Sequence, residues 1–211
     1  MLDKLVDFYD NWSKGARAKD LEQLAREFNF RYEKRVEFGS QPSDIKSFEV
    51  FSKKGLKRFM GVMETDLEKC KGTVRFYDYI RTKDLETFSK SIVEVYCEDV
   101  RTDYFKIEPK GFFTRTKYLF KSKAKIQPRF KEFHKQFFIH TESREVQYLL
   151  NRKVLDLMLD FPKLQMEARG HCFVFYYNNS KEIPIGDVMP LIDFAEEVVN
   201  QLGTGEDEGY V

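Results

Sequence analysis

Apolar residues recur at helical spacing at both ends of the chain. Residues 2–9 and 15–28 each carry an apolar residue every three or four positions, which is the spacing of one helix face. The same spacing returns in residues 143–160 and in the segment DVMPLIDFAEEVVNQL at 187–202, which Gly203 ends. We therefore expect two short N-terminal helices, one or two helices before residue 160, and a C-terminal helix.

The central part of the chain alternates apolar and polar residues, which is typical of strands with one buried face. The turn-rich segment GSQPSD at 39–44 precedes this part and predicts a short helical turn capped by Ser43 or Asp44. The predicted strands are 57–66, 73–82, 87–97, 104–108, 136–141, 164–168 and 172–177. The first three are joined by short connections, so we expect an antiparallel meander.

Strands and helices follow one another in runs, without strict β-α alternation. This order indicates an α+β fold, with an antiparallel sheet and helices at the N-terminus, between strands and at the C-terminus. We expect residues 1–202 to form a single domain and residues 203–211, GTGEDEGYV, to be a disordered acidic tail.

The middle strand of the meander carries the first candidate binding surface. Val74, Phe76 and Ile80 alternate with a second set of side chains, which we expect on the solvent face of the sheet. That second set consists of Arg75, Tyr77, Tyr79 and Arg81. Tyrosines beside arginines are enriched in protein interfaces, so this set is a candidate surface for another protein or for self-association.

Asp78 is the exception in this pattern, because the alternation turns its carboxylate inward. A buried carboxylate is costly unless it is paired, so backbone amides or a nearby arginine are the expected partners. Together with Glu108 and Lys110, Asp78 also resembles the acidic strand and Glu-x-Lys arrangement of metal-dependent nucleases. Pro109, between Glu108 and Lys110, fits a central strand poorly, which weakens this alternative.

Residues 110–135 hold nine lysines and arginines, one acid and six aromatic residues. The candidate anion-binding residues of this segment are Arg115, Lys117, Lys121, Lys123 and Lys125. One hypothesis is weak binding to nucleic acid or to an anionic surface. The alternative is a buried helical stripe, formed by Phe112, Thr116, Leu119 and Phe120 and then by Ile126, Phe130, Phe133 and Phe137.

The charge distribution favours the buried stripe over the nucleic-acid surface. Residues 141–211 contain thirteen acids and six bases, so they can neutralise the basic segment within the molecule. The chain as a whole has 211 residues and a net charge of +1, which is unlike the strongly basic character of most nucleic-acid-binding domains.

Several classes of protein are disfavoured by composition. The sequence has no long uncharged apolar run, so we expect no transmembrane segment, and its charged first residues do not predict a secretory signal. Cys70, Cys97 and Cys172 are far apart in sequence, as in a protein of the reducing cytoplasm. The three histidines lack a second ligand at a suitable spacing, so we expect neither a metal nor a cofactor.

The chain resembles a bacterial family of uncharacterised proteins over about two-thirds of its length. The residues that carry the resemblance are Phe48, Phe51, Gly61, Val74, Phe76, Asp78 and Tyr79, followed by Phe130, Phe133, Phe137, Ile139, Glu142, Leu149, Leu150 and the segment CFVFYY. Most are core positions, and the family has no assigned activity. The resemblance therefore implies a fold and no particular chemistry.

The leading functional hypothesis is a non-enzymatic, cytoplasmic binding domain that uses the Arg75 to Arg81 surface and the basic segment. No phosphate-binding glycine loop and no nucleophile motif is present in the sequence. A metal-dependent hydrolase that uses Asp78 and Glu108 is the enzymatic alternative.

Overall fold

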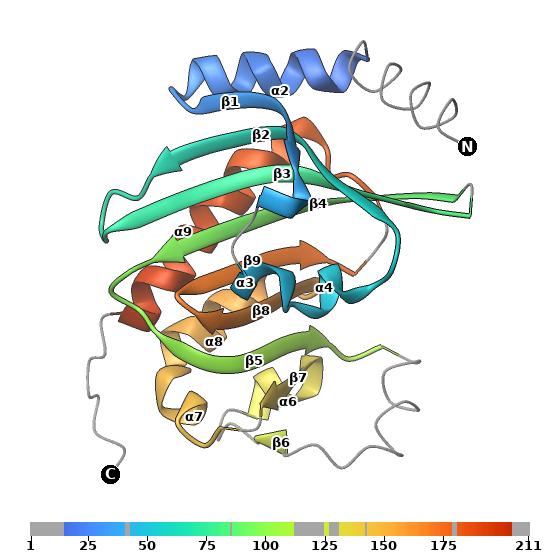
Figure 1. The fold of residues 1–211 in the computed structure, drawn as a ribbon. Helices are drawn as coiled ribbons and strands as arrows, with labels where there is room; N and C mark the ends of the chain where they lie inside the picture. Colours follow the sequence, from blue (N-terminus) through green and yellow to red (C-terminus); the bar gives the residue numbers. More distant parts are fainter. Residues whose placement is uncertain are drawn as a thin grey trace.

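The computed structural model describes residues 15–40, 43–84, 86–111, 125–126, 131–141, 143–178 and 181–203. Within these residues the chain folds as an α+β protein with one antiparallel sheet of nine strands, in the order β1-β2-β3-β4-β9-β8-β5-β7-β6 (Figure 1). The predicted fold class is confirmed.

The strands agree with most of the predicted ranges. They are β1 (Arg31–Glu37), β2 (Leu56–Asp66), β3 (Gly72–Lys83), β4 (Glu86–Cys97), β5 (Thr102–Pro109), β6 (Lys125–Ile126), β7 (Phe137–Thr141), β8 (Leu164–Gly170) and β9 (Cys172–Tyr177). Strands β2, β3 and β4 form the predicted meander. Gly170, the last residue of β8, has φ 60°, in the left-handed region, where the chain turns into β9.

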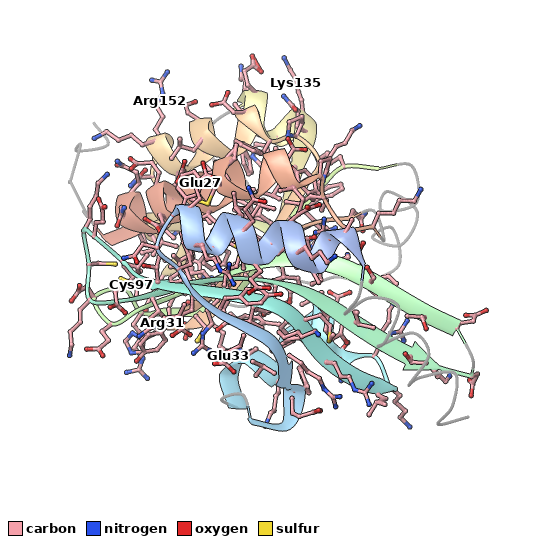
Figure 2. The ribbon with its side chains drawn as sticks, turned by 90° about the horizontal axis from the view of Figure 1, so that it is seen from above. Glu27, Arg31, Glu33, Cys97, Lys135 and Arg152 are labelled. Carbon is pink, nitrogen blue, oxygen red and sulfur yellow. The ribbon has the colours of Figure 1, made fainter. Side chains whose placement is uncertain are left out.

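Helices and short helical turns cover both faces of this sheet. They are α2 (Ala16–Glu27), α3 (Ser43–Lys46), α4 (Glu49–Ser52), α6 (Lys131–Gln136), α7 (Val146–Leu149), α8 (Arg152–Asp160) and α9 (Val188–Gly203), with 3-10 turns η1 (Phe38–Ser40) and η2 (Ile185–Asp187). Helix α9 packs on β3 and β4, and α8 packs on α9. Figures 1 and 2 show α3 and α4 on the opposite side of the sheet from α8 and α9.

Each face of the sheet has its own hydrophobic core. The larger core lies under α2, α8 and α9, and it includes the inward residues Val74, Phe76 and Ile80 of β3. The smaller core lies under α3 and α4, where Phe51 of α4 and Phe59 of β2 join the tyrosines of β3. The sheet therefore has no large solvent face in its centre.

The predicted exposure of Tyr77 and Tyr79 is wrong, because this second core covers them. Tyr77 is 1% exposed and Tyr79 is 0% exposed. Tyr77 stacks on Phe59 at 4.1 Å between ring centroids, and Tyr79 packs edge-on to Phe51 at 5.0 Å. The alternation of β3 correctly separates two faces, but the short helices α3 and α4 bury the face that we expected to be in water.

The predicted helical stripe from Ile126 to Phe137 is also wrong in its extent. Ile126 belongs to β6 and pairs with Ile139, while Phe137 begins β7. Among the described residues between them, those of α6 are helical, and Phe133 of α6 is buried as expected and stacks on Phe137 at 4.9 Å.

Several other predictions concern residues outside the described part of the chain. They are the first N-terminal helix, the stripe that begins at Phe112, Phe130, and most of the acidic tail. No described helix has the length and apolar character needed to cross a membrane.

Phe133→Ala should lower the free energy of unfolding by about 3–5 kcal/mol, because it removes a buried ring and leaves a cavity beside Phe137. Urea denaturation followed by circular dichroism measures this change. Tyr148→Ala is the matched control, since Tyr148 is 77% exposed and its loss should change the free energy by less than about 0.5 kcal/mol. Equal stability of the two variants would contradict the burial of Phe133.

Candidate functional site

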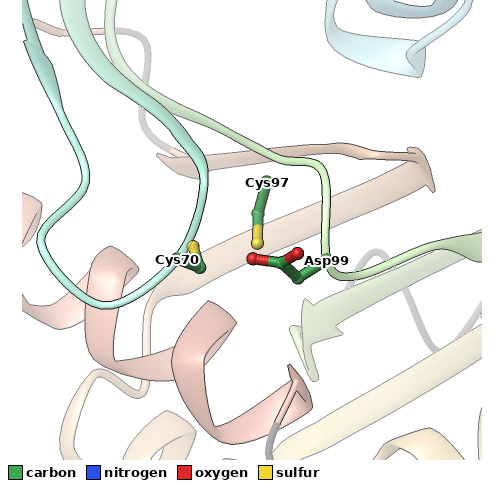
Figure 3. Close-up of side chains that lie close together, drawn as sticks. All are labelled: Cys70, Cys97 and Asp99. Atoms are coloured by element: carbon green, nitrogen blue, oxygen red, sulfur yellow. The ribbon is translucent and has the colours of Figure 1, made fainter.

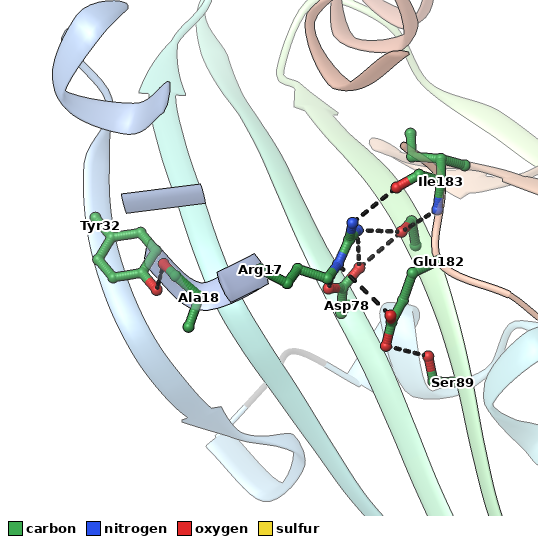
Figure 4. A network of polar contacts seen from close by, with 8 residues as sticks. Arg17, Ala18, Tyr32, Asp78, Ser89, Glu182 and Ile183 are labelled. Atoms are coloured by element: carbon green, nitrogen blue, oxygen red, sulfur yellow. Dashed lines mark hydrogen bonds and ion pairs between the residues drawn. The ribbon is translucent and has the colours of Figure 1, made fainter. Parts of the chain in front are cut away.

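Asp78 is held by an arginine of the first described helix, which is one of the partners expected from the sequence. The Arg17 guanidinium donates from Nε to Oδ2 of Asp78 at 2.6 Å and from Nη2 to Oδ1 at 2.9 Å (Figure 4). Ser91 on β4 donates to the same carboxylate at 2.7 Å. Arg17 also donates to the carbonyl of Ile183, at 2.7 Å.

This network joins four parts of the chain that are far apart in sequence. Arg17 belongs to α2, Asp78 to β3 and Ser91 to β4, while Ile183 precedes α9. The backbone amide of Ile183 donates back to Ser91 Oγ at 3.1 Å. Both carboxylate oxygens of Asp78 accept hydrogen bonds from side chains within the fold. This is the geometry of a structural carboxylate.

Glu108, the second candidate acid, lies on the other face of the sheet. Its carboxylate is 3.1 Å from His140 Nε2 and 3.2 Å from Lys106 Nζ. Strands β3 and β5 are four positions apart in the sheet, a separation of roughly 19 Å at the usual strand spacing. Asp78 and Glu108 therefore do not share one metal ion. Lys110 donates to the backbone carbonyl of His134 and lies 4.7 Å from the ring of Phe138.

Glu167 on β8 fixes α4 against the same face of the sheet. Its buried carboxylate accepts hydrogen bonds from the backbone amides of Glu49 at 2.6 Å and Val50 at 3.2 Å, the first two residues of α4. It also accepts from the hydroxyls of Tyr104 and Tyr176. Burial, followed by the charge of Glu167, raises the pKa of both tyrosines, which therefore stay neutral donors.

Basic side chains gather beside α4, at the end of the sheet where β3 turns into β4. Strand register places Lys57 opposite Arg81, and Arg81 opposite Phe88, on the face that α4 covers. Lys90 follows Phe88 on the same face, two positions along β4. We define the basic patch as Lys53, Lys57, Arg81 and Lys90.

Lys90 is the unusual member of the basic patch, because it is only 6% exposed. Its Nζ lies 4.6 Å from the ring centre of Tyr176 and 5.6 Å from that of Phe88. Among the described residues, no carboxylate lies within ion-pair distance of this Nζ. Burial, then the charges of Lys106 and Lys53, lowers the pKa of Lys90 to about 8, although Glu167 acts in the opposite direction.

The other members surround Lys90 with further positive charge. Arg81 lies with Cζ 5.3 Å from the ring of Phe88, and its Nη1 donates to the Lys54 carbonyl at 3.3 Å. Lys57 is half-buried, and burial followed by the charge of Arg81 lowers its pKa. Lys53 is exposed, so the patch is open to solvent on the side of the α4–β2 connection.

The predicted binding surface on β3 is thus divided along the strand. At one end, Arg75 is paired with Glu64 and lies 3.6 Å from Glu94. In the middle, Tyr77 and Tyr79 are buried, and only Arg81 at the other end reaches the basic patch. Lys90 was not predicted from the sequence, because it alternates with the inward residues Val93 and Val95 and so lies on the face of β4 that the pattern assigns to solvent.

The remaining candidate residues are those of the basic segment. Arg115, Lys117, Lys121 and Lys123 lie outside the described residues. Lys125 forms β6 and pairs with His140, and its side chain is outside the description as well. The nucleic-acid hypothesis for this segment therefore stays a prediction.

No protein-family model matches the chain, and neither a curated protein nor a solved structure matches it. The resemblance to a bacterial family of uncharacterised proteins therefore stays a prediction. The basic patch has to be interpreted from its own geometry and charge.

Tyr79→Phe should raise the free energy of unfolding by about 1 kcal/mol, because it removes a buried hydroxyl that has no partner among the described residues. Tyr77→Phe is the matched variant. It should lower the free energy by about 1.5–3 kcal/mol, since the Tyr77 hydroxyl donates to the buried Glu94 carboxylate at 2.8 Å. Chemical denaturation of both variants tests the pair, and destabilisation of equal size in both would contradict it.

Arg17→Met should destabilise the protein by about 3–5 kcal/mol, because it leaves the buried Asp78 carboxylate without its cation. Arg26→Met on the same helix is the control, since its partner Glu22 is exposed and the pair is worth less than about 0.5 kcal/mol. Thermal and urea unfolding measure both changes. A loss of stability in Arg17→Met no larger than in Arg26→Met would show that the Asp78 network does not hold α2.

Proposed function

We propose that this protein acts by binding a small ligand that carries a phosphate group, with the basic patch as its binding site. The observation that carries the proposal is the nearly buried side chain of Lys90, whose ammonium group has no carboxylate partner among the described residues. A buried charge without a counterion is unfavourable, and a bound anion would supply that counterion. The proposal keeps the idea of a binding protein and moves its site from the buried tyrosines to the end of the β3–β4 hairpin.

Phosphate fits the basic patch better than a single carboxylate does. Four basic side chains, Lys53, Lys57, Arg81 and Lys90, form this patch, and a phosphate group carries up to two negative charges. The planar guanidinium of Arg81 suits two-point contact with phosphate oxygens, whereas lysine acts as a point charge. The half-buried ring of Phe88 lies between Arg81 and Lys90 and offers an apolar surface for the remainder of the ligand.

The fixed position of Lys90 also supports a binding role. Lys90 pairs with Tyr79 of β3, and Tyr176, over which its ammonium lies, is tied to Glu167. Glu167 in turn anchors the first residues of α4, from which the chain leads to Lys53. The cationic groups are therefore held in place before a ligand arrives, which lowers the entropic cost of binding.

Lys90→Met should weaken the binding of inorganic phosphate and phenyl phosphate about tenfold or more, since a hydrogen bond to a charged group is worth about 1.5–3 kcal/mol. Isothermal titration at low ionic strength measures the affinities. Lys19→Met is the matched control, because Lys19 is an exposed lysine of α2 and its replacement changes the net charge equally. Equal affinity of the two variants, or acetate bound as tightly as phosphate, would contradict the proposal.

Sulfate keeps its charge between pH 6 and 10, so a change in its affinity over this range comes from the titration of the protein. Because Lys90 loses its proton with a pKa of about 8, sulfate affinity should be highest below pH 8 and should fall as the pH rises above it. Lys90→Arg should retain sulfate binding above pH 8, since arginine stays charged. Affinity that does not change between pH 6 and 10 in the wild-type protein would exclude Lys90 as the binding cation.

A further inference from the structure

Two cysteines and an aspartate converge at the end of the β3–β4 hairpin that lies opposite its turn. Cys70 belongs to the connection between β2 and β3, Cys97 is the last residue of β4, and Asp99 follows in the next turn. Figure 3 shows their side chains gathered in one place. The two sulfur atoms and a carboxylate oxygen all lie within 4.8 Å of one another.

The backbone holds these three residues together. The Glu98 amide donates to the Lys71 carbonyl at 2.8 Å, and the Lys71 amide donates to Asp99 Oδ2 at 3.0 Å. Gly72 allows this close approach, since a Cβ atom at this position would lie 1.9 Å from the Tyr96 carbonyl oxygen. The backbone and the register of the hairpin therefore place Cys70, Cys97 and Asp99 close together.

We propose that Cys70, Cys97 and Asp99 form a binding site for a divalent cation that prefers thiolate ligands, with zinc as the reference ion. Zinc binds cysteine sulfur at about 2.3 Å and carboxylate oxygen at about 2.0–2.2 Å. Ligand atoms of a tetrahedral site are then roughly 3.8 Å apart at most, so the observed spacing needs only a small contraction. Three protein ligands leave a fourth position for water or an external ligand.

The charges around the three residues favour a cation. Two acidic side chains, Asp99 and Glu196 of α9, lie near the Cys70 thiol. The two nearby lysines are already engaged, since Lys69 pairs with Glu197 at 3.0 Å and Lys71 pairs with Glu98 at 2.5 Å. A bound divalent ion would offset this excess of negative charge.

The site also has the access that metal exchange requires. Cys97 is buried, Cys70 is half-buried and Asp99 is exposed, so the ligands run from the core to the surface. A metal ion would join the β2–β3 connection to the end of β4, which are otherwise linked here by backbone hydrogen bonds.

Cobalt(II) titration of the reduced protein under anaerobic conditions tests the proposal. The wild-type protein should bind one equivalent and show the near-ultraviolet charge-transfer band of thiolate-bound cobalt, and zinc should displace the cobalt and raise the melting temperature. Cys70→Ser should lose most of the band. Asp99→Asn keeps the acceptor for the Lys71 amide, so it should keep the fold and bind cobalt at least tenfold more weakly.

Cys172→Ser is the matched control, because Cys172 belongs to the smaller core on the other face of the sheet. It should bind cobalt as the wild-type protein does. Urea unfolding of each metal-free variant shows whether a loss of binding has occurred in a folded protein. A wild-type protein without the charge-transfer band, or an unchanged band in Cys70→Ser, would overturn the proposal. If zinc stabilises Asp99→Asn as much as it stabilises the wild-type protein, Asp99 is not a ligand of the site.

Discussion

The burial of both faces of one sheet is the constraint on which this structure depends. A strand with covered faces has no side that opens to water, so each polar side chain in it needs a partner within the protein. The inner strands nevertheless carry carboxylates, and each meets a group from another element. Asp78 meets Arg17 of α2, Glu108 meets His140 of β7, and Glu167 meets the amides of α4. The contacts of Asp78 and Glu167 thus hold α2 and α4 against the sheet, and that of Glu108 joins β5 to β7.

Lys90 departs from this rule, because its ammonium group has no carboxylate partner among the described residues. Its pKa of about 8 in the folded protein lies below the ordinary value of 10.5, so the folded state holds its proton less tightly than the unfolded chain does. This difference opposes folding below pH 8 and is relieved as the pH rises from 8 to 10.5. A bound anion would remove the same cost at neutral pH. Charged groups that lower the stability of the folded protein, and whose cost a bound ligand offsets, are typical of binding sites.

Local patterns predicted the strands and the main helices, because period and turn chemistry are properties of short segments. The alternation in β3 separated Phe76 from Tyr77 correctly. The inward position of Asp78 correctly indicated a buried carboxylate, and its partner is an arginine, one of the two kinds of partner expected. The alternation did not show that the second face was covered, because the cover is a pair of four-residue helices distant from β3 in sequence. The spacing from Ile126 to Phe137 likewise fits a helix, but strand pairing with β7 determines the structure at Ile126.

The two proposed sites differ in how well they can be predicted from the sequence. The burial of Lys90 can be predicted only if the face that α4 covers is known, and no local pattern gives that face. The cysteine site follows from the β3–β4 register, because Cys70 lies thirteen positions before Lys83 and Asp99 thirteen positions after Glu86, the residues that pair across the turn. The sites lie at opposite ends of one hairpin, and Lys90 and Cys97 are seven residues apart on β4, roughly 23 Å along the strand. Between them, the Arg17 and Asp78 pair fixes the hairpin to α2. Because this continuous ladder separates the sites, a cation at one end and an anion at the other can bind without sharing a ligand residue.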